Sequence, residues 1–198
     1  MINRLRIATP SGVLLIEPIA EEEALERKAS AEELSAVEGF KSASRRRERL
    51  AWRALLREEL GESYTIEYAE SGAPRIVGAR YPHISVSHSQ THVAVLLSAK
   101  PCGVDIESLG RNFERIESRY VLPEERELST EHWWPAALWA SKEALYKMAG
   151  KSGLELLHDL KIISFVADGC NICAKICDEQ AVELQLLLHE DQVVVYTL

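Results

Sequence analysis

Cysteine, positive charge and long apolar runs are all scarce in this sequence. The 198 residues include four cysteines, too few for the disulfide-dense architecture of small secreted domains. The longest apolar runs, such as Val93–Leu97 and Val193–Tyr196, are far shorter than the ~20 residues that a membrane-spanning helix requires. The formal net charge of -8 argues against a broad nucleic-acid-binding surface. We therefore expect a protein that binds neither a membrane nor nucleic acid.

The composition is otherwise that of an ordinary globular protein. Hydrophobic residues make up 46% of the chain and charged residues 27%. The first residues lead into strand-like sequence without an apolar signal segment, so we expect a cytoplasmic location. The length suits one large domain or two small ones.

The order of predicted elements occurs twice along the chain. Long helices are predicted from about Ser42 to Leu60 and from about Pro135 to Gly150, and antiparallel strands follow each of them. No fixed-period sequence repeat accompanies this duplication. The pattern predicts an α+β fold of two similar halves, residues 1–98 and 99–198, each a small antiparallel sheet packed with a long helix.

Apolar runs between turn residues predict the strands. A capping-box pattern, Ser30 with Glu33, predicts a short helix before the first long one. Short helices are also predicted at Asn112–Tyr120 and Pro123–Leu128. The predicted strands are Arg4–Ala8, Val13–Pro18, Tyr64–Tyr68, His83–Ser87, His92–Leu97, Gly103–Glu107, Lys161–Val166, Asn171–Cys177, Val182–Leu188 and Gln192–Thr197.

Two short motifs place acidic residues where they could converge. Asp105 and Glu107 alternate along a predicted strand and therefore point to the same face. Glu143 and Lys147 lie four residues apart on a predicted helix and share a face. Either motif alone is also typical of an edge strand or an ordinary helix surface. If strand and helix meet, however, three carboxylates gather beside a lysine, a set that suits Mg2+ and phosphate chemistry.

A third segment, Ile84–Ser89, ends a strand with His88 between two serines. Hydroxyl groups, an imidazole and turn amides are suitable donors to a phosphate, although a polar hairpin turn has the same composition. A hydrolase nucleophile is a poor interpretation because the Gly-x-Ser-x-Gly elbow is missing.

Charge is distributed unevenly along the first half. Seven acidic residues lie between Glu21 and Glu38, whereas seven bases and only one acid, Glu48, lie between Lys41 and Arg57. A local basic patch on an acidic protein indicates a compact anionic ligand or an acidic partner, and a solvated helix face is the alternative.

Three of the four cysteines are clustered, at Cys170, Cys173 and Cys177. A zinc or redox site would need a fourth ligand or a helix start, and neither is evident. The segment is better interpreted as a strand, with Ile172, Ala174 and Ile176 on one face.

Tyr81–Ser89, Gly103–Glu107 and Trp139–Lys147, in this order and spacing, resemble the 4'-phosphopantetheinyl transferases of the surfactin-synthetase-activating type. The resemblance covers roughly residues 40–150. It implies transfer of phosphopantetheine from coenzyme A to a serine of an apo acyl or peptidyl carrier protein, with Mg2+. It also implies a pseudo-dimer of two α/β halves with the coenzyme between them, and the two-half length favours a monomer.

The resemblance also implies roles for individual residues. Asp105, Glu107 and Glu143 would bind Mg2+, and Glu143, Lys147 and His88 would take part in catalysis. Glu143 is the first candidate for the base that accepts the serine proton, and a neutral Lys147 is the second. The residues expected to bind the coenzyme are Arg45, Arg46, Arg53, Arg75, Ser87, His88, Lys142 and Lys147.

One segment departs from the family pattern. The family often has Gly-Lys-Pro before the histidine segment, and this chain has Gly72-Ala73-Pro74-Arg75. The lysine that would contact the coenzyme is therefore absent, and Arg75 is the candidate to replace it. The departure leaves open an alternative, a non-catalytic module that binds coenzyme A or a carrier protein. A P-loop enzyme is not supported because the Gly-x-x-x-x-Gly-Lys-Ser/Thr loop is missing.

An acidic carrier protein would need a local basic surface on this acidic chain. Arg111, Arg115 and Arg119 recur at α-helical spacing and would form one stripe after the predicted metal-binding strand. Interleaved Glu114 and Glu117 are equally compatible with a solvated helix face.

Overall fold

A computed structural model describes residues 4–61, 64–69 and 72–198. The first half forms an antiparallel sheet with the order β1-β2-β6-β5-β4-β3, and the second half forms another with the order β7-β11-β10-β9-β8. The strands of the first sheet are β1 (Leu5–Thr9), β2 (Gly12–Pro18), β3 (Thr65–Tyr68), β4 (Pro74–Val77), β5 (His83–His88) and β6 (His92–Ser98). Those of the second are β7 (Val104–Ser108), β8 (Leu160–Val166), β9 (Asn171–Ile176), β10 (Val182–His189) and β11 (Gln192–Thr197).

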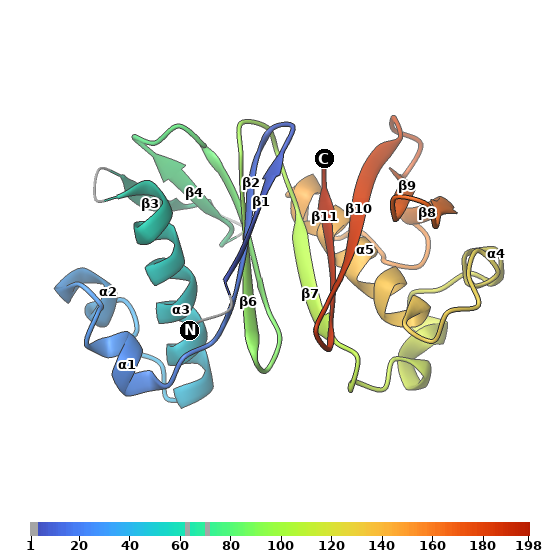
Figure 1. Cartoon of the computed structure of the whole chain (residues 1–198). Coiled ribbons are helices and arrows are strands. Elements are labelled where there is room, and N and C mark those ends of the chain that lie inside the picture. The colour runs from blue at the N-terminus through green and yellow to red at the C-terminus, as the bar shows by residue number, and fades with distance from the viewer. Residues whose placement is uncertain (1–3, 62–63, 70–71) are drawn as a thin grey trace.

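Each sheet is covered on its outer face by one long helix, and the two sheets face each other in the middle of the molecule (Figure 1). Helix α3 (Ala43–Leu60) packs on the first sheet and α5 (Trp134–Ala149) on the second. The shorter elements are α1 (Glu22–Glu26), α2 (Ala31–Ser35), the 3-10 helix η1 (Glu114–Arg119) and α4 (Pro123–Arg126). The predicted α+β fold of two similar halves is confirmed.

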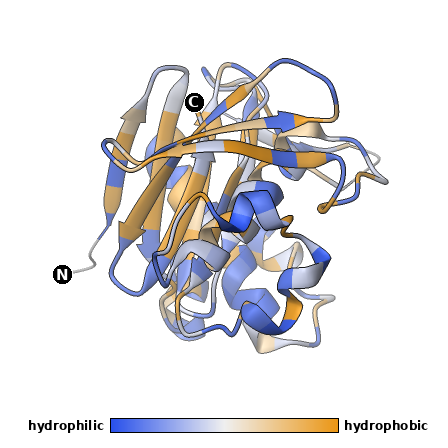
Figure 2. Cartoon of the chain, turned by 90° about the vertical axis from the view of Figure 1, so that its right-hand side faces the viewer, coloured by the Kyte–Doolittle hydropathy of each residue, from blue (hydrophilic) through white to orange (hydrophobic). Residues whose placement is uncertain are grey.

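The central strands are apolar on both faces because they separate two cores. On β2, Val13 and Leu15 pack toward α3, whereas Leu14 and Ile16 pack toward the second sheet. Strand β11 alternates in the same way between the α5 core and the core between the sheets. Figure 2 shows the resulting concentration of apolar residues on the strands and of hydrophilic residues on the outer helices. A strand buried on both faces is expected to have a continuous apolar sequence, as Val93–Leu97 does.

Most predicted elements are confirmed to within a few residues, including the capping box between Ser30 and Glu33. The predicted face of β9 is also confirmed, with Ile172, Ala174 and Ile176 buried. Two elements were missed, α1 and β4. Helix α1 buries only Leu25, and β4 begins with proline, so neither has a clear apolar period.

A buried ion pair links α4 to α5 beneath the second sheet. The Nζ atom of Lys142 lies 2.7 Å from Oε2 of Glu125, and the two side chains are 0% and 1% exposed. Glu125 also accepts hydrogen bonds from the backbone N–H groups of Leu122 and Ile162. Burial lowers the pKa of Lys142, and the Glu125 carboxylate opposes that shift. The prediction that Lys142 contacts the coenzyme is therefore wrong, because its ammonium has no exposed surface.

Strand β7 and helix α5 approach each other at a glycine. A Cβ added to Gly103 would lie 1.8 Å from the carbonyl oxygen of Ala144. The Gly103 N–H donates to Oγ1 of Thr197, which fixes the chain at this point. Only glycine permits this backbone separation, and the separation determines how close the acidic face of β7 comes to α5.

Replacing Lys142 by Met should lower the free energy of unfolding by about 3–5 kcal/mol, because Glu125 is left buried without its counter-ion. Urea titration followed by circular dichroism measures the change. Lys151→Met is the matched control, since Lys151 pairs with Glu179 on the surface of the same half. Comparable losses in the two variants would contradict a structural role for the buried pair.

Gly103→Ala should lower the free energy of unfolding by about 1–3 kcal/mol, because β7 and α5 must separate to admit the methyl group. Gly39→Ala is the control, since a Cβ at Gly39 meets nothing within 4 Å. Thermal unfolding of both variants tests the expectation, and native stability of Gly103→Ala would show that the contact is not tight.

Candidate active site

The acidic face of β7 lies against α5, as the two motifs predicted. Val104 and Ile106 enter the core between the sheets, and the intervening Asp105 faces Lys147. The Nζ atom of Lys147 donates to Oδ1 of Asp105 at 2.7 Å and to the carbonyl oxygen of Val104 at 3.0 Å. Strand and helix thus meet where the sequence places the carboxylates.

Asp105 is the centre of the arrangement. Its side chain is buried, and Oδ1 accepts hydrogen bonds from Lys147 and from the Ser87 hydroxyl, the latter at 2.6 Å. Its Oδ2 atom is buried and has no hydrogen-bond partner within the described part of the chain. A buried carboxylate oxygen without a partner is costly, so this atom is a suitable ligand for a cation.

Burial and the charge of Asp105 raise the pKa values of two further carboxylates. Burial, followed by the nearby Asp105 carboxylate, raises the pKa of Glu107 to about 7, and Arg111 acts in the opposite direction. Burial and Asp105 also raise the pKa of Glu143, which Lys147 partly offsets. These shifts show that negative charge is concentrated here beyond what the neighbouring bases neutralise.

The oxygen donor set fits Mg2+, which takes one or two carboxylates together with water and substrate phosphates. The three carboxylates form an open group. Among residues 4–61, 64–69 and 72–198, the only group of His, Cys, Asp or Glu residues with ligand atoms within 4.8 Å of one another lies elsewhere, at His92, His189 and Glu190. The ligand atoms of Asp105, Glu107 and Glu143 thus do not all lie within 4.8 Å of one another in this structure.

His88 ends β5 and is held by α3. Its Nε2 atom lies 3.2 Å from Oε2 of Glu48, and Glu48 in turn accepts a hydrogen bond from the Ser44 hydroxyl. About half of the His88 side chain is exposed. The ring is thus oriented by a carboxylate and open to a ligand.

Three cavities share lining residues, and we call them together the cleft. The first, about 360 Å3, has walls from both halves, including Ala73, Pro74 and Lys147. The second, about 350 Å3, shares Pro74 with the first and contains Arg45 and His88. The third, about 500 Å3, shares His88 with the second and reaches Glu107 and Arg111. Residues of the basic helix α3 and of the acidic strand β7 therefore both line the cleft.

The predicted coenzyme contacts on α3 are only partly in the cleft. Arg45 lines it beside His88. Arg46 instead pairs with Glu22 of α1 at 2.5 Å and donates to the carbonyl oxygen of Phe40. Arg53 is buried, donates to the Tyr68 hydroxyl and lines a separate cavity near α2.

The remaining predicted contacts are also placed by the structure. Arg75 is exposed and lies 3.7 Å from Glu67, whereas the preceding Ala73 and Pro74 line the cleft. Ser87 is buried, and its hydroxyl donates a hydrogen bond to the Asp105 carboxylate. Ser87 thus positions the acidic centre in this structure.

The α-helical spacing on which the predicted arginine stripe depends is wrong. Arg111 lies before η1, and it pairs with Glu107 at 2.7 Å. Its guanidinium lies over the rings of Phe113 and Trp139, at 4.8 and 5.0 Å from their centroids. Because η1 is a 3-10 helix with three residues per turn, a spacing of four does not align side chains on it.

Sequence reasoning missed three residues of the site and its support. Arg49 lines the cleft beside Arg45, Glu48 orients His88, and Glu125 holds Lys142. Glu48 had a signal, since it is the single acid in the basic segment between Lys41 and Arg57. Glu125 had none, because its partner lies 17 residues away.

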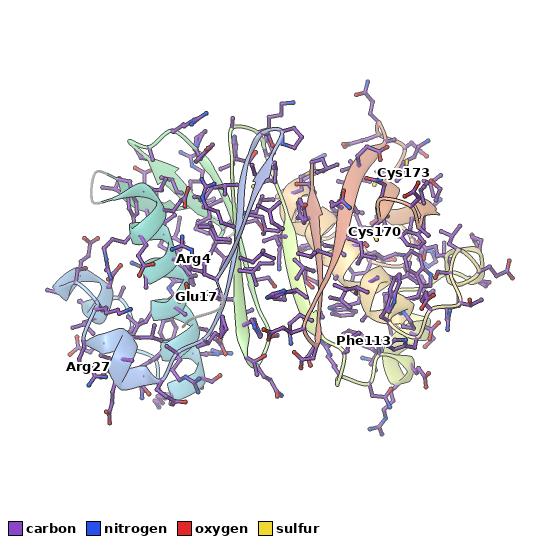
Figure 3. All side chains as sticks on the ribbon, viewed as in Figure 1. Arg4, Glu17, Arg27, Phe113, Cys170 and Cys173 are labelled. Carbon is purple, nitrogen blue, oxygen red and sulfur yellow. The ribbon has the colours of Figure 1, made fainter. Side chains whose placement is uncertain are left out.

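The clustered cysteines are not among the residues that line the cleft. All four cysteines are free, and Cys170 and Cys173 lie on the outer side of the second half (Figure 3). Arg27 of the acidic segment lies at the opposite end of the molecule (Figure 3).

Within the described residues, none of the helices combines the length and the apolar character needed to cross a bilayer.

Comparison with known proteins gives two findings. A family model described as the 4'-phosphopantetheinyl transferase superfamily matches residues 101–197, which include Asp105, Glu107, Glu143 and Lys147. A 4'-phosphopantetheinyl transferase of Bacillus subtilis is 27% identical over 175 residues, covering 80% of this chain and 77% of that protein. These matches, with the geometry of β7 and α5, make the second half similar to the 4'-phosphopantetheinyl transferase superfamily and the chain similar to a 4'-phosphopantetheinyl transferase.

Proposed function

We propose that this protein transfers 4'-phosphopantetheine from coenzyme A to a serine of an acyl or peptidyl carrier protein, with Mg2+, releasing 3',5'-ADP. The observation that carries the proposal is the unpaired, buried Oδ2 atom of Asp105 at the boundary between the halves. Burial and the Asp105 carboxylate raise the pKa values of Glu107 and Glu143, and the other oxygen of Asp105 pairs with Lys147. That combination suits a cation and a diphosphate in one place.

The residues that would hold Mg2+ are Asp105, Glu107 and Glu143. When bound, the ion would supply positive charge to the phosphate oxygens of the substrate. Lys147 already spans from Asp105 to the backbone of β7, so its ammonium is fixed where phosphate charge develops. His88, oriented by Glu48, donates to a phosphate oxygen from the other half of the cleft.

Glu143 is the proposed base for the serine hydroxyl of the carrier. Its pKa is raised by burial and by Asp105, which brings a carboxylate closer to the basicity that a general base needs. Lys147 is a poorer candidate because its ammonium is paired with Asp105.

Arg45 and Arg49 are the proposed contacts for the 3'-phosphate of coenzyme A. Both line the cleft beside His88, where Arg49 also donates to the Tyr68 hydroxyl. Arg46 and Arg53 do not line the cleft. The Ala73–Pro74 backbone forms the wall that faces Lys147 across the boundary. We expect one chain to suffice, a monomer, because both walls of the cleft come from the same chain.

The proposal is tested by incubating the protein with coenzyme A, MgCl2 and an apo carrier protein, and by weighing the carrier with mass spectrometry. A mass increase equal to one phosphopantetheine group supports transfer. The missing lysine at Ala73 keeps one alternative, a module that binds coenzyme A or the carrier without turnover. Calorimetric binding of coenzyme A without any change in carrier mass would favour that alternative.

Asp105→Asn should abolish transfer, because the amide cannot neutralise a bound cation. Added MgCl2 should raise the melting temperature of the native protein with coenzyme A present, and leave that of the variant unchanged. Asp168→Asn, on the exposed turn after β8, is the control for a lost carboxylate. Native turnover by Asp105→Asn would refute the assignment of the metal site.

Stabilisation by Mg2+ should increase with pH. The pKa of Glu107 is raised from its ordinary value of 4.5 to about 7. Ionisation of Glu107 therefore lowers the free energy of unfolding as the pH rises from 4.5 through about 7. A bound cation removes this cost, and it binds only the ionised carboxylate. Melting curves with and without MgCl2 at about pH 6 and about pH 8 should therefore differ more at the higher pH. Glu107→Gln should lose this difference.

Arg45→Ala should raise the KM for coenzyme A by about tenfold, which corresponds to the loss of about 1.4 kcal/mol of binding. Arg46→Ala is the matched control, since Arg46 lies one residue along α3 and pairs with Glu22. Dephospho-coenzyme A, which lacks the 3'-phosphate, should be affected little by either change. Equal effects of Arg45→Ala on both substrates would exclude a contact to the 3'-phosphate.

A further inference from the structure

A second cluster of ligand-type side chains lies where the two halves meet. His92 begins β6 of the first sheet, and His189 and Glu190 lie at the turn between β10 and β11 of the second. One ligand atom from each of the three lies within 4.8 Å of the others. The Nε2 atom of His92 is 3.4 Å from a carboxylate oxygen of Glu190. The cluster thus joins residues about 100 positions apart in sequence.

The Nε2 atoms of the two histidines in this cluster are buried and make no hydrogen bond with the described residues. The His92 side chain is 5% exposed, and its Nε2 atom has no hydrogen-bond partner among the described residues. The same holds for the Nε2 atom of His189. The two rings meet edge to face, with centroids 6.1 Å apart. Buried ring nitrogens without a hydrogen bond can accept an additional ligand, and for His92 that ligand would lie beside the Glu190 carboxylate.

The second nitrogen of His92 is held by neighbouring residues. Its Nδ1 atom lies 2.9 Å from the Thr91 hydroxyl oxygen. That oxygen also accepts a contact from the Gln192 amide of the second half, at 3.5 Å. If Nδ1 carries the proton and donates it to Thr91, the Nε2 lone pair faces Glu190. Metal-bound histidines commonly have this arrangement, with the other ring nitrogen donating to an oxygen.

The donor set and its spacing indicate a particular cation. Two imidazoles and a carboxylate suit Zn2+, whereas Mg2+ prefers oxygen ligands alone. Tetrahedral Zn2+ with bonds of ~2.0–2.1 Å places its ligand atoms about 3.3–3.4 Å apart. The His92–Glu190 separation of 3.4 Å already matches that value. The exposed side of Glu190 leaves room for a water as fourth ligand.

We propose that His92, His189 and Glu190 form a Zn2+ site that joins the two halves, separate from the acidic face of β7. It lies at the far end of that strand from Gly103, since Gln192 pairs with Ser108. It also adjoins the β5–β6 turn, where the His92 N–H donates to Oγ of Ser89, next to His88. Bound Zn2+ would therefore hold the turn that follows His88 against the second half.

The test uses the full chain without an oligohistidine tag, after treatment with a chelator. Calorimetric titration with ZnCl2 should give one equivalent, and ZnCl2 should raise the melting temperature. His189→Gln and Glu190→Gln, both on the turn, should each weaken Zn2+ binding by at least about tenfold. His158→Gln, an exposed histidine in the same half, and Asp105→Asn should bind Zn2+ as the native protein does.

Cobalt provides a readout of the ligand types. Co2+ bound here should give the visible absorption of a tetrahedral site without a sulfur-to-metal charge-transfer band. A sulfur band, or loss of binding in Cys173→Ser, would place the metal at the cysteines and overturn the proposal. Native affinity in both His189→Gln and Glu190→Gln, or no Zn2+ binding by the native chain, would overturn it as well.

Discussion

The burial of β7 on both faces is the constraint on which the candidate active site depends. Val104 and Ile106 pack into the core between the two sheets, so the alternate residue Asp105 is turned toward α5. Gly103 lets the strand approach the backbone of α5 at Ala144. A carboxylate is thereby buried beside a lysine, and its second oxygen has no hydrogen-bond partner in the described part of the protein. The apolar contacts of one strand therefore bury a carboxylate whose unpaired oxygen a cation would bind.

Two lysines on the same helix have different roles because one is fully buried and the other is partly exposed. Lys142 and Lys147 lie five residues apart on α5, and each pairs with a carboxylate at 2.7 Å. Lys142 points into the second half and has no exposed surface, so its pair with Glu125 stabilises the packing of α4 against α5. Lys147 is 28% exposed at the boundary between the halves and faces the cleft. Only the second can contact a substrate, although both belong to one sequence motif.

The boundary between the halves concentrates the polar residues that the cores exclude. Along it lie the β7 carboxylates, the Ser87 hydroxyl, His88 with Glu48, and the histidine cluster at the β10–β11 turn. The Ser87–Asp105 hydrogen bond and the histidine cluster join the two halves, so movement of one half would disturb both, whereas His88 and Glu48 lie in the first half. The proposed Zn2+ site would act on this same boundary, and the proposed Mg2+ site would draw its ligands from the second half alone.

The sequence determined the elements, the duplication and the acidic motif, because strand alternation, helical spacing and glycine stops are local properties. The alternation of β7 was enough to put Asp105 and Glu107 on one face, and helical spacing was enough to put Glu143 and Lys147 on one face of α5. Local patterns did not decide which arginine of α3 enters the cleft. Arg45 and Arg46 are neighbours, and the position of α1, whose Glu22 binds Arg46, distinguishes them. The tertiary structure likewise decided that Lys142 is buried against Glu125 and that His92 contacts His189, because packing between distant segments brings these side chains together.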